Sequence, residues 1–378
     1  MDHRAIILIS GILLLLVAAS SAVRILRGYL DYGIDASILN TCRSRIQAWW
    51  ILFGLLTCTL LLGTVATTVL FFIISFWAMR EYITLTPTRP ADHRTLFWVF
   101  FLWTPVQFLL VGFNDTWFRE MFGISSYQVY SILIPAYAFL LLPAGIAASN
   151  DSKRFLERVA KIQVGLVICV YSLSFAPALL TTTLPLEHEA PAIIEAFAGG
   201  VEQKVLAPVE KAIVREKADS VSEESVPMQS PRSSMTSDRL CLLVYFVFLV
   251  QMSDIFQYLW SQFFKNGVVA PAINSNKTWP GVLAGAMSTA LLAMGLWYFT
   301  PFRLWWQPLV TGFIISIMGF AGSITMSAIK RDRGVADYGT LIEGHNGVLD
   351  RIDSLCFAAP VFFHLVWLFL NLELRPFF

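Results

Sequence analysis

One polar stretch between two long apolar segments carries the side chains best suited to chemistry. Residues 330–353 read KRDRGVADYGTLIEGHNGVLDRID. Carboxylates bind Mg²⁺ through oxygen, and Lys and Arg side chains bind phosphate oxygens. The groups of interest are the carboxylates of Asp337, Asp350 and Asp353 and the cations Lys330, Arg331, Arg333 and Arg351. Their combination predicts phosphate chemistry with a divalent cation at a membrane surface.

Two of these carboxylates are spaced to act together. Asp350 and Asp353 stand three residues apart, so in a helix they share one face and can bind the same metal ion. Nearby glycines, among them Gly344 and Gly347, let the backbone approach a ligand. We interpret His345 as a hydrogen-bond donor to phosphate or as an ordinary loop histidine. Both interpretations are preferred to a role as general base. The alternative for the basic residues is an ordinary cytoplasmic loop rich in Lys and Arg.

A second polar cluster lies within residues 253–281. Asp254 interrupts an otherwise apolar segment, close to Tyr258, and an ionisable side chain there needs a partner or a function. Its alternative role is a structural pair with a basic residue. Lys277 and Thr278 directly precede the next apolar segment. At that place an ammonium group, a hydroxyl group and unpaired helix N–H groups can bind phosphate.

The composition requires a membrane environment for the elements that position these clusters. The chain has 378 residues, of which 56% are hydrophobic and 14% charged, and its mean hydropathy is +0.64. Soluble domains have about 25% charged residues. The sequence therefore predicts an all-α polytopic membrane bundle of about ten transmembrane helices. The formal net charge of +1 predicts no nucleic-acid partner.

Ten spans are predicted, with a tight reversal near Gly63 that divides residues 49–79 into two helices. The spans are 5–23, 49–63, 65–79, 95–112, 127–147, 162–184, 239–262, 281–299, 304–328 and 354–372. Alternation then puts five loops on one face, namely 24–48, 80–94, 148–161, 263–280 and 330–353. These loops hold 17 of the 27 Lys and Arg residues. That excess predicts that this face is cytoplasmic and that both termini lie on the other side.

Three regions follow from this pattern. Residues 1–184 form N-terminal transmembrane helices, residues 185–238 a polar extramembrane insertion, and residues 239–378 a C-terminal catalytic transmembrane domain. Within the insertion, apolar residues recur at helical spacing between Ile194 and Ile213 and predict an amphipathic helix. The Ser- and Pro-rich stretch after it is typical of disorder. The alternative is an insertion tolerated between spans without a role of its own.

The stretch Ser327–Asp353 resembles the signature of phosphatidate cytidylyltransferases, also called CDP-diacylglycerol synthases. That signature reads Ser-x-x-Lys-Arg-x-x-x-x-Lys-Asp, then a Pro-Gly-His-Gly-Gly turn and Leu-Asp-Arg-x-Asp. Family members also carry Asp-x-Phe-Ala-Tyr, which matches residues 254–258. Their Ser-Pro-Lys-Lys-Thr-Trp-Glu-Gly motif matches residues 274–281. The resemblance covers about the last 140 residues of the chain.

The resemblance implies an enzyme that joins CTP and phosphatidic acid, or a related lipid phosphate, into CDP-diacylglycerol and pyrophosphate with Mg²⁺ or another divalent cation. The catalytic residues expected from it are Asp337, Asp350, Lys330 and Arg331. The expected substrate-binding residues are Asp254, Tyr258, Lys277, Thr278, His345 and Arg351. The expected metal ligands are Asp350, Asp337 and Asp353. The expected location is a bacterial inner (cell) membrane, with membrane lipids as partners and the active site facing the cytoplasm. A homodimer is possible on this interpretation.

Departures from the signature mark a divergent member. Ala336, Pro280 and Glu343 stand where the family has Lys, Glu and Pro. Two alternatives stay close to the family: a cytidylyltransferase for another lipid phosphate, and a non-catalytic relative that binds CDP-lipid. A third alternative is a membrane transporter that uses Asp254 as an ion site.

Overall fold

The computed structural model describes residues 3–27, 36–86, 88–113, 115–181, 231–335 and 347–373. Within them the chain is helical almost throughout, with one two-stranded hairpin. The elements in chain order are α1 (His3–Arg27), α2 (Ala36–Leu62), α3 (Thr64–Leu85), η2 (Pro90–Asp92), α4 (His93–Trp98), η3 (Val99–Trp103), α5 (Thr104–Gly112), α6 (Asp115–Phe122), α7 (Ser126–Ile132), η4 (Leu133–Ala138), α8 (Phe139–Ala147), α9 (Phe155–Leu166), η5 (Val167–Ser172), α10 (Leu173–Thr181), α13 (Pro231–Phe263), β1 (Val268–Ala270), β2 (Asn274–Thr278), α14 (Trp279–Gly295), η6 (Trp297–Phe299), α15 (Trp306–Asp332) and α16 (Leu349–Glu373).

Membrane-length helices dominate the described residues. Eight helical segments are long and apolar enough to cross a membrane, and Trp49–Leu62 and Trp279–Gly295 are shorter apolar helices. Together they coincide with the ten predicted spans. The predicted all-α polytopic membrane bundle is therefore confirmed.

The predicted reversal between the second and third spans is also confirmed. α2 ends at Leu62, α3 begins at Thr64, and Gly63 between them has a φ of 109°. Glycine adopts this conformation without a steric penalty because it has no Cβ atom. The reversal brings the start of α2 and the end of α3 to the same end of the bundle, as the expected alternation required.

Two predicted boundaries are wrong. The third span was expected to end at residue 79, but α3 continues to Leu85 because its polar last turns find partners inside the protein. α13 begins at Pro231, inside the expected insertion. Residues 182–230, with the expected amphipathic helix and the first part of the Ser- and Pro-rich stretch, lie outside the described residues, so these expectations stay predictions. The end of that stretch, residues 231–238, was expected to be disordered and is instead the first part of α13.

Three consecutive spans change their helical winding in the middle. η3, η4 and η5 are π-helical segments within the spans Pro90–Gly112, Ser126–Ala147 and Phe155–Thr181. Each has a proline in it or shortly after it, namely Pro105, Pro135 and Pro177. Proline removes one backbone donor and its ring clashes with the preceding turn, so a locally widened helix accommodates it.

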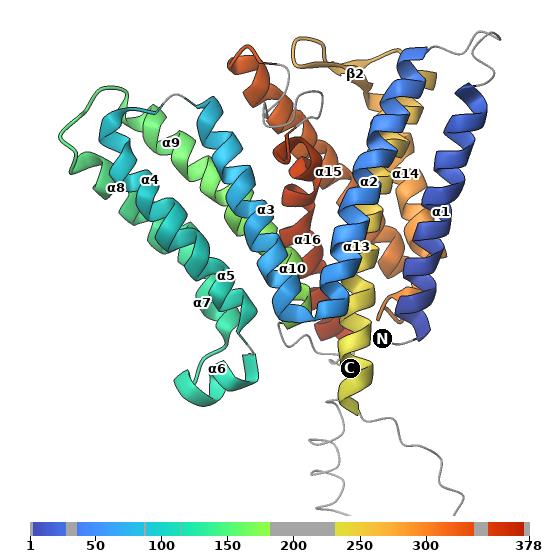
Figure 1. Cartoon of the computed structure of the whole chain (residues 1–378), viewed down its shortest axis with the longest axis horizontal. Coiled ribbons are helices and arrows are strands. Elements are labelled where there is room, and N and C mark those ends of the chain that lie inside the picture. Colours follow the sequence, from blue (N-terminus) through green and yellow to red (C-terminus); the bar gives the residue numbers. More distant parts are fainter. Residues whose placement is uncertain are drawn as a thin grey trace, which may run out of the picture.

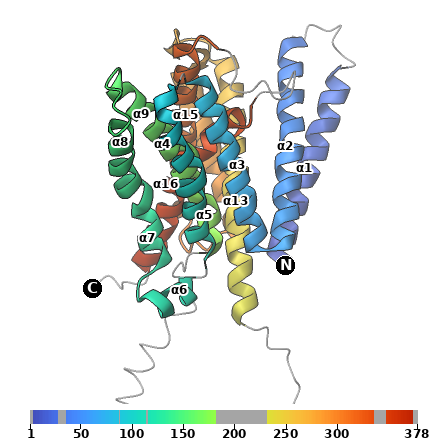
Figure 2. The same cartoon turned by 60° about the vertical axis from the view of Figure 1, so that its left-hand side comes forward.

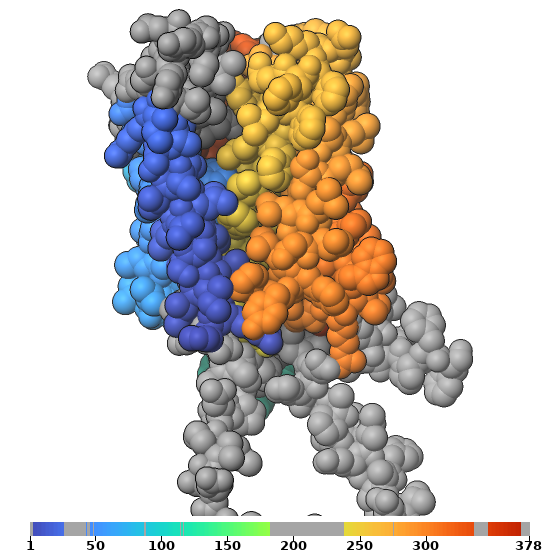
Figure 3. All heavy atoms as spheres, turned by 90° about the vertical axis from the view of Figure 1, so that its right-hand side faces the viewer, coloured from blue at the N-terminus to red at the C-terminus, as the bar shows by residue number. Residues whose placement is uncertain are grey.

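The four C-terminal helices pack closely against one another and are called the central helices here, although α14 also has an outward face. In Figures 1 and 2, α13, α14, α15 and α16 lie between α1 and α2 on one side and α4, α5, α7 and α8 on the other. α15 packs against both α14 and α16, and α14 packs against α13. Figure 3 shows α1, in blue, beside the yellow and orange surface of α13 and α14. The central helices carry both polar clusters.

The loops expected to share one face lie at the same end of the bundle. Figure 1 shows at this end the β1–β2 hairpin, the last turns of α15, the first turns of α16, and the connections from α3 to α4 and from α8 to α9. The start of α1 and the end of α16 lie at the opposite end. We call the first of these ends the hairpin end.

A buried ion pair fixes two connections at the hairpin end. The Arg158 guanidinium binds both Asp92 carboxylate oxygens, with Nε at 2.8 and 3.1 Å, and the two side chains are 4% and 1% exposed. The same guanidinium donates to the Asp151 carbonyl at 2.7 Å, and Asp151 also pairs with Arg89 at 3.0 Å. A bidentate pair of this kind holds α9 against the start of α4.

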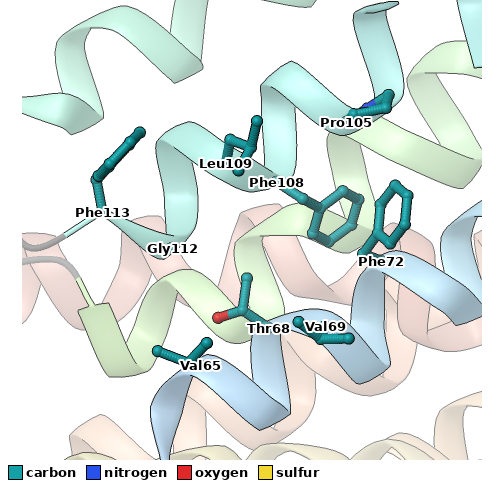
Figure 4. Close-up of a pocket in the computed structure, with 9 residues that line it drawn as sticks. All are labelled: Val65, Thr68, Val69, Phe72, Pro105, Phe108, Leu109, Gly112 and Phe113. Carbon is teal, nitrogen blue, oxygen red and sulfur yellow. The ribbon is translucent and has the colours of Figure 1, made fainter. Parts of the chain in front are cut away.

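An apolar cavity lies away from both polar clusters. It has a volume of about 320 Å³ and opens between the first half of α3 and α5, with Phe72, Phe108 and Leu109 among its lining residues (Figure 4). Thr68 supplies the one side-chain hydroxyl group among the labelled residues. This lining suits hydrocarbon and does not suit nucleotide or phosphate.

Candidate active site

The candidate site forms where four chain segments end or begin at the hairpin end. α13 brings Asp254, β2 brings Lys277, and the last turn of α15 brings Lys330. α16 begins at Leu349, so Asp350 and Asp353 both lie in its first turns, as the helical spacing required. Sequence positions 254, 277, 330 and 350 therefore meet in one place through the alternation of the spans.

Small residues allow these helices to approach closely. A Cβ atom at Gly322 of α15 would lie 2.5 Å from the Asp353 carbonyl oxygen of α16. A Cβ atom at Gly285 of α14 would lie 2.8 Å from the Gln257 Cα atom of α13. Helices in membranes associate through such close backbone packing, since lipid offers no hydrophobic drive between them. Glycine at these two positions brings the polar side chains of different helices within reach of one another.

Two carboxylates meet at one hydroxyl group. The Ser354 Oγ atom lies 3.0 Å from Asp254 Oδ1, to which it donates, and 3.4 Å from Asp353 Oδ1. Asp353 also accepts from the Ser354 backbone N–H at 2.7 Å. Asp254, Lys277 and Asp350 all lie close enough for their charges to act on the Asp353 carboxylate. The site therefore combines at least three carboxylates with nearby cations.

Lys330 and Asp350 form an ion pair across the site. The Lys330 Nζ atom lies 2.8 Å from Asp350 Oδ1, and the side chains are 18% and 7% exposed. A cation in the last turn of α15 and a carboxylate in the first turn of α16 both complement their helix dipoles. The Arg331 Nε atom donates to the Ile273 carbonyl at 3.3 Å, which ties the end of α15 to the hairpin.

Lys277 is held by a glutamine that stands where the family pattern has alanine. The Lys277 Nζ atom donates to Gln257 Oε1 at 3.2 Å and lies 5.3 Å from the centroid of the Phe320 ring. Gln257 is fully buried, and its Nε2 atom donates to the Ser316 carbonyl and hydroxyl oxygens, both at 2.9 Å. The amide oxygen thus points toward the ammonium because the amide nitrogen is fixed on α15.

A hairpin that the sequence did not predict carries Lys277 and Thr278. β1 and β2 are antiparallel, with Val268 opposite Thr278. Thr278 is the N-cap of α14, and its hydroxyl oxygen accepts from the Gly281 N–H at 3.2 Å. This cap satisfies one of the unpaired donors at the helix start. The Thr278 hydroxyl therefore has a structural role, and its expected contact with substrate stays a prediction.

For the remaining expected site residues, the structure gives only the degree of burial or no description. Tyr258 is half-buried and lies one turn beyond Asp254 on α13. Arg351 is also half-buried and directly follows Asp350 on α16. Asp337 and His345 lie outside the described residues. In the part of the chain that the structure describes, no group of three His, Cys, Asp or Glu side chains is arranged to hold a metal ion. The expected metal site with Asp350, Asp353 and Asp337 therefore stays a prediction.

Sequence reasoning missed one acidic residue at this end of the bundle. Glu81 of α3 is 4% exposed, and its carboxylate accepts from the backbone N–H groups of Val348 at 3.0 Å and Leu349 at 2.8 Å. We had assigned residue 81 to a loop beyond the third span. The available signal was a lone carboxylate in a helical segment, which needs a partner when it is buried.

The chain matches a known protein family over most of its length. The model of the cytidylyltransferase family matches residues 43–369. The uncharacterized protein YnbB of Escherichia coli K12 is 30% identical over 326 residues, which cover 85% of this chain and 86% of that protein.

Two phosphatidate cytidylyltransferases match over a shorter stretch. The protein from Haemophilus influenzae is 40% identical over 128 residues, or 32% of this chain and 44% of that protein. The protein from Rickettsia typhi is 33% identical over 138 residues, or 35% of this chain and 60% of that protein. These matches span about half of each relative. The family model nevertheless covers most of the chain, including every described residue of the site, and the chain therefore belongs to the cytidylyltransferase family of membrane nucleotidyltransferases.

Proposed function

We propose that this chain transfers a cytidylyl group from CTP to the phosphate of phosphatidic acid and so forms CDP-diacylglycerol and pyrophosphate. The observation that carries the proposal is the meeting of Asp254 and Asp353 at the Ser354 hydroxyl group, one helical turn from the Lys330–Asp350 ion pair, at one end of a membrane-spanning bundle. The choice of lipid is supported by the two relatives named phosphatidate cytidylyltransferase.

In the proposed reaction a phosphate oxygen of the lipid attacks the α-phosphorus of CTP. A new oxygen–phosphorus bond forms while the bond from the α-phosphorus to the bridging β-phosphate oxygen breaks, and that electron pair leaves with pyrophosphate. The nucleophile is already an anion, so the step needs no strong general base. Positioning of the two phosphates and neutralisation of their charge then supply most of the catalysis.

The cations of the site are held in place before substrate arrives. Asp350 orients the Lys330 ammonium at 2.8 Å, and Gln257 orients the Lys277 ammonium at 3.2 Å. Arg331 is tied to the hairpin at the same end. Preorganised cations lower the repulsion between two phosphate groups without reorganising during the reaction. We assign phosphate binding to these three side chains and to Arg351.

The carboxylates are of the chemical type that binds a divalent cation. Asp254 and Asp353 meet at one hydroxyl group, and neighbouring carboxylates of this kind are stabilised by a bound cation. Hard cations such as Mg²⁺ take oxygen ligands of this type. We propose Asp350 and Asp353 as ligands, with Asp254 beside them and Asp337 as a further ligand from outside the described residues. When bound, the cation would neutralise phosphate charge and stabilise the leaving pyrophosphate.

We assign the site to the cytoplasmic face of a bacterial inner membrane. The five loops expected at that face hold 17 of the 27 Lys and Arg residues. Such an excess in short loops is typical of the cytoplasmic side. Labelling of an Asp332→Cys variant in a background without the five native cysteines tests the assignment, because a membrane-impermeant maleimide should then react only after the cells are opened.

The decisive experiment is a cytidylyl-transfer assay on the purified chain in nanodiscs with phosphatidic acid, CTP and Mg²⁺. Label on the α-phosphate should enter the lipid, and label on the γ-phosphate should leave as pyrophosphate in equal amount. Asp350→Asn should abolish transfer while the variant stays folded and inserted. The matched control is Asp332→Asn, since Asp332 lies at the end of α15 and its side chain is 70% exposed.

The alternatives give different results in the same assay. Transfer to another lipid phosphate, but not to phosphatidic acid, would replace the lipid named here and keep the chemistry. Binding of CTP or CDP-lipid without transfer to any lipid phosphate identifies a non-catalytic relative. A transporter would carry flux across liposomes without forming CDP-lipid. Full activity of Asp350→Asn would overturn the role assigned to that carboxylate.

A further inference from the structure

The carboxylate of Glu81 forms an unusual contact between the two halves of the chain. It lies near the end of α3, more than 260 residues before its partners, and its two oxygens accept separately from Val348 N–H at 3.0 Å and Leu349 N–H at 2.8 Å. The side chain is 4% exposed. Because each oxygen has its own donor, the contact fixes both the position and the direction of the α16 start.

The chemistry of a helix N-terminus explains why this carboxylate is stable there. The first backbone N–H groups of a helix have no partner within the helix, and the aligned peptide dipoles favour negative charge beside them. Glu81 supplies both an acceptor for two of these groups and that charge. A buried carboxylate with such partners is retained at low energetic cost, whereas an apolar residue in its place would leave the two donors unpaired.

The anchored residues are next to the proposed catalytic group. Asp350 directly follows Leu349, and its Oδ1 atom lies 2.8 Å from Lys330 Nζ on α15. Asp353 lies one turn further along α16. Successive residues of a helix lie about 1.5 Å apart along its axis, so Asp350 belongs to the same first turn as Leu349. A small shift of that turn therefore moves Asp350 by a comparable distance. A contact made by α3 at the residue before Asp350 therefore bears on the position of Asp350 against Lys330.

We propose that Glu81 is a positioning residue, which holds the start of α16 so that Asp350 stays in register with Lys330. The proposal rests on the proposed function for its effect on catalysis, although the anchor itself is independent of it. Glu81 also occupies the N–H groups of Val348 and Leu349, which keeps substrate phosphate from binding at the very start of α16 and leaves it to the cations of the site.

The test combines one readout of the anchor with one of catalysis. Amide hydrogen exchange of the peptide containing residues 348–351 is measured in nanodiscs without substrate, for the wild type and for Glu81→Gln. Loss of the charged acceptor should raise exchange there by roughly ten- to a hundredfold. In the cytidylyl-transfer assay kcat should fall by about ten- to a hundredfold, because displaced catalytic groups lose rate at nearly unchanged substrate binding. KM for CTP should change by much less.

Two further variants keep the test decisive. Glu81→Asp retains the charge with a shorter reach, so its exchange and its kcat should both lie between those of the wild type and Glu81→Gln. The control is Arg80→Gln, because Arg80 is the exposed neighbour of Glu81 and lies over the Trp77 ring. This control should leave exchange and kcat unchanged.

The possible failures are separable. Unchanged exchange at residues 348–351 in both Glu81 variants overturns the anchor, whatever their activity. Raised exchange with unchanged kcat overturns the positioning role. Raised exchange in a chain that transfers cytidylyl groups to no lipid phosphate supports the anchor and rejects the proposed function.

Discussion

The link between Gln257 and Lys277 gives the sharpest test of how this site binds phosphate. The structure places Lys277 Nζ 3.2 Å from Gln257 Oε1. A charge-assisted hydrogen bond contributes about 1.5–3 kcal/mol, and its usual length is about 2.7–2.9 Å. Because the Lys277–Gln257 distance is longer than usual, we expect the lower end of that energy range, about 1.5 kcal/mol. This energy corresponds to roughly a tenfold effect on an equilibrium or rate.

The perturbation is a double-mutant cycle with Gln257→Met and Lys277→Met. Methionine keeps most of the volume of both side chains and removes their polar groups. Gln257→Met should lower kcat/KM for CTP about tenfold in the presence of Lys277, because the ammonium then loses one of the groups that orient it. In the Lys277→Met background the same change should have little effect. The expected coupling energy is about 1–1.5 kcal/mol.

The second role of Gln257 needs a separate measurement. Its Nε2 atom donates to the Ser316 carbonyl and hydroxyl oxygens at 2.9 Å, so Gln257→Met should also lower stability by about 1–2 kcal/mol. That loss is present in both backgrounds and cancels in the cycle. Gln251→Met is the matched control, since Gln251 is a buried glutamine on the same helix. If the effects of Gln257→Met and Lys277→Met on kcat/KM are additive within about 0.5 kcal/mol, Gln257 does not orient Lys277 and the reasoning is refuted.

Three further predictions concern packing, the buried ion pair and the cation. In Gly322→Leu, a Cβ atom would already lie 2.5 Å from the Asp353 carbonyl oxygen, so α16 must shift. The free energy of unfolding should fall by about 1–3 kcal/mol, and cytidylyl transfer should be lost. Unchanged thermal unfolding and activity would contradict this. Arg158→Met leaves buried Asp92 without its bidentate partner and should cost about 3–5 kcal/mol in thermal unfolding, while kcat per folded molecule stays within about twofold of the wild type. Chelation of divalent cations should stop cytidylyl transfer, and added Mg²⁺ should restore it; transfer in the presence of excess chelator would contradict a metal role.

Hydropathy and loop charge were sufficient to predict the succession of apolar helices along the described chain. All ten predicted spans have a helical counterpart, and the reversal at Gly63 occurs where the turn residues indicated. Alternation then required the segments with Lys277, Lys330 and Asp350 to reach the same end of the bundle. This inference needs only the number of spans between two segments, and that number follows from the bilayer thickness.

Lateral contacts between helices could not be predicted in the same way. Hydropathy says that a segment lies in lipid, but not which neighbour each of its faces touches. Gln257 was therefore a polar residue without an assigned role until the structure placed Lys277 and Ser316 on either side of its amide. The β1–β2 hairpin escaped prediction for a related reason, since strands of three and five residues with an irregular register leave little periodic pattern.

One N-terminal helix, α3, contacts the segment that carries Asp350, and it is connected to the helices behind it. α3 holds the start of α16 through Glu81, and α3 is itself fixed by the next layer, because the Ser75 hydroxyl donates to the Cys169 carbonyl of η5 at 2.7 Å. Close approach of α9 adds to this, since a Cβ atom at Gly165 would lie 2.6 Å from the Tyr82 ring. The residue after Glu81 thus packs against α9 while Glu81 itself contacts α16. A change that loosens α9 from α3 should therefore reach Asp350 through Glu81.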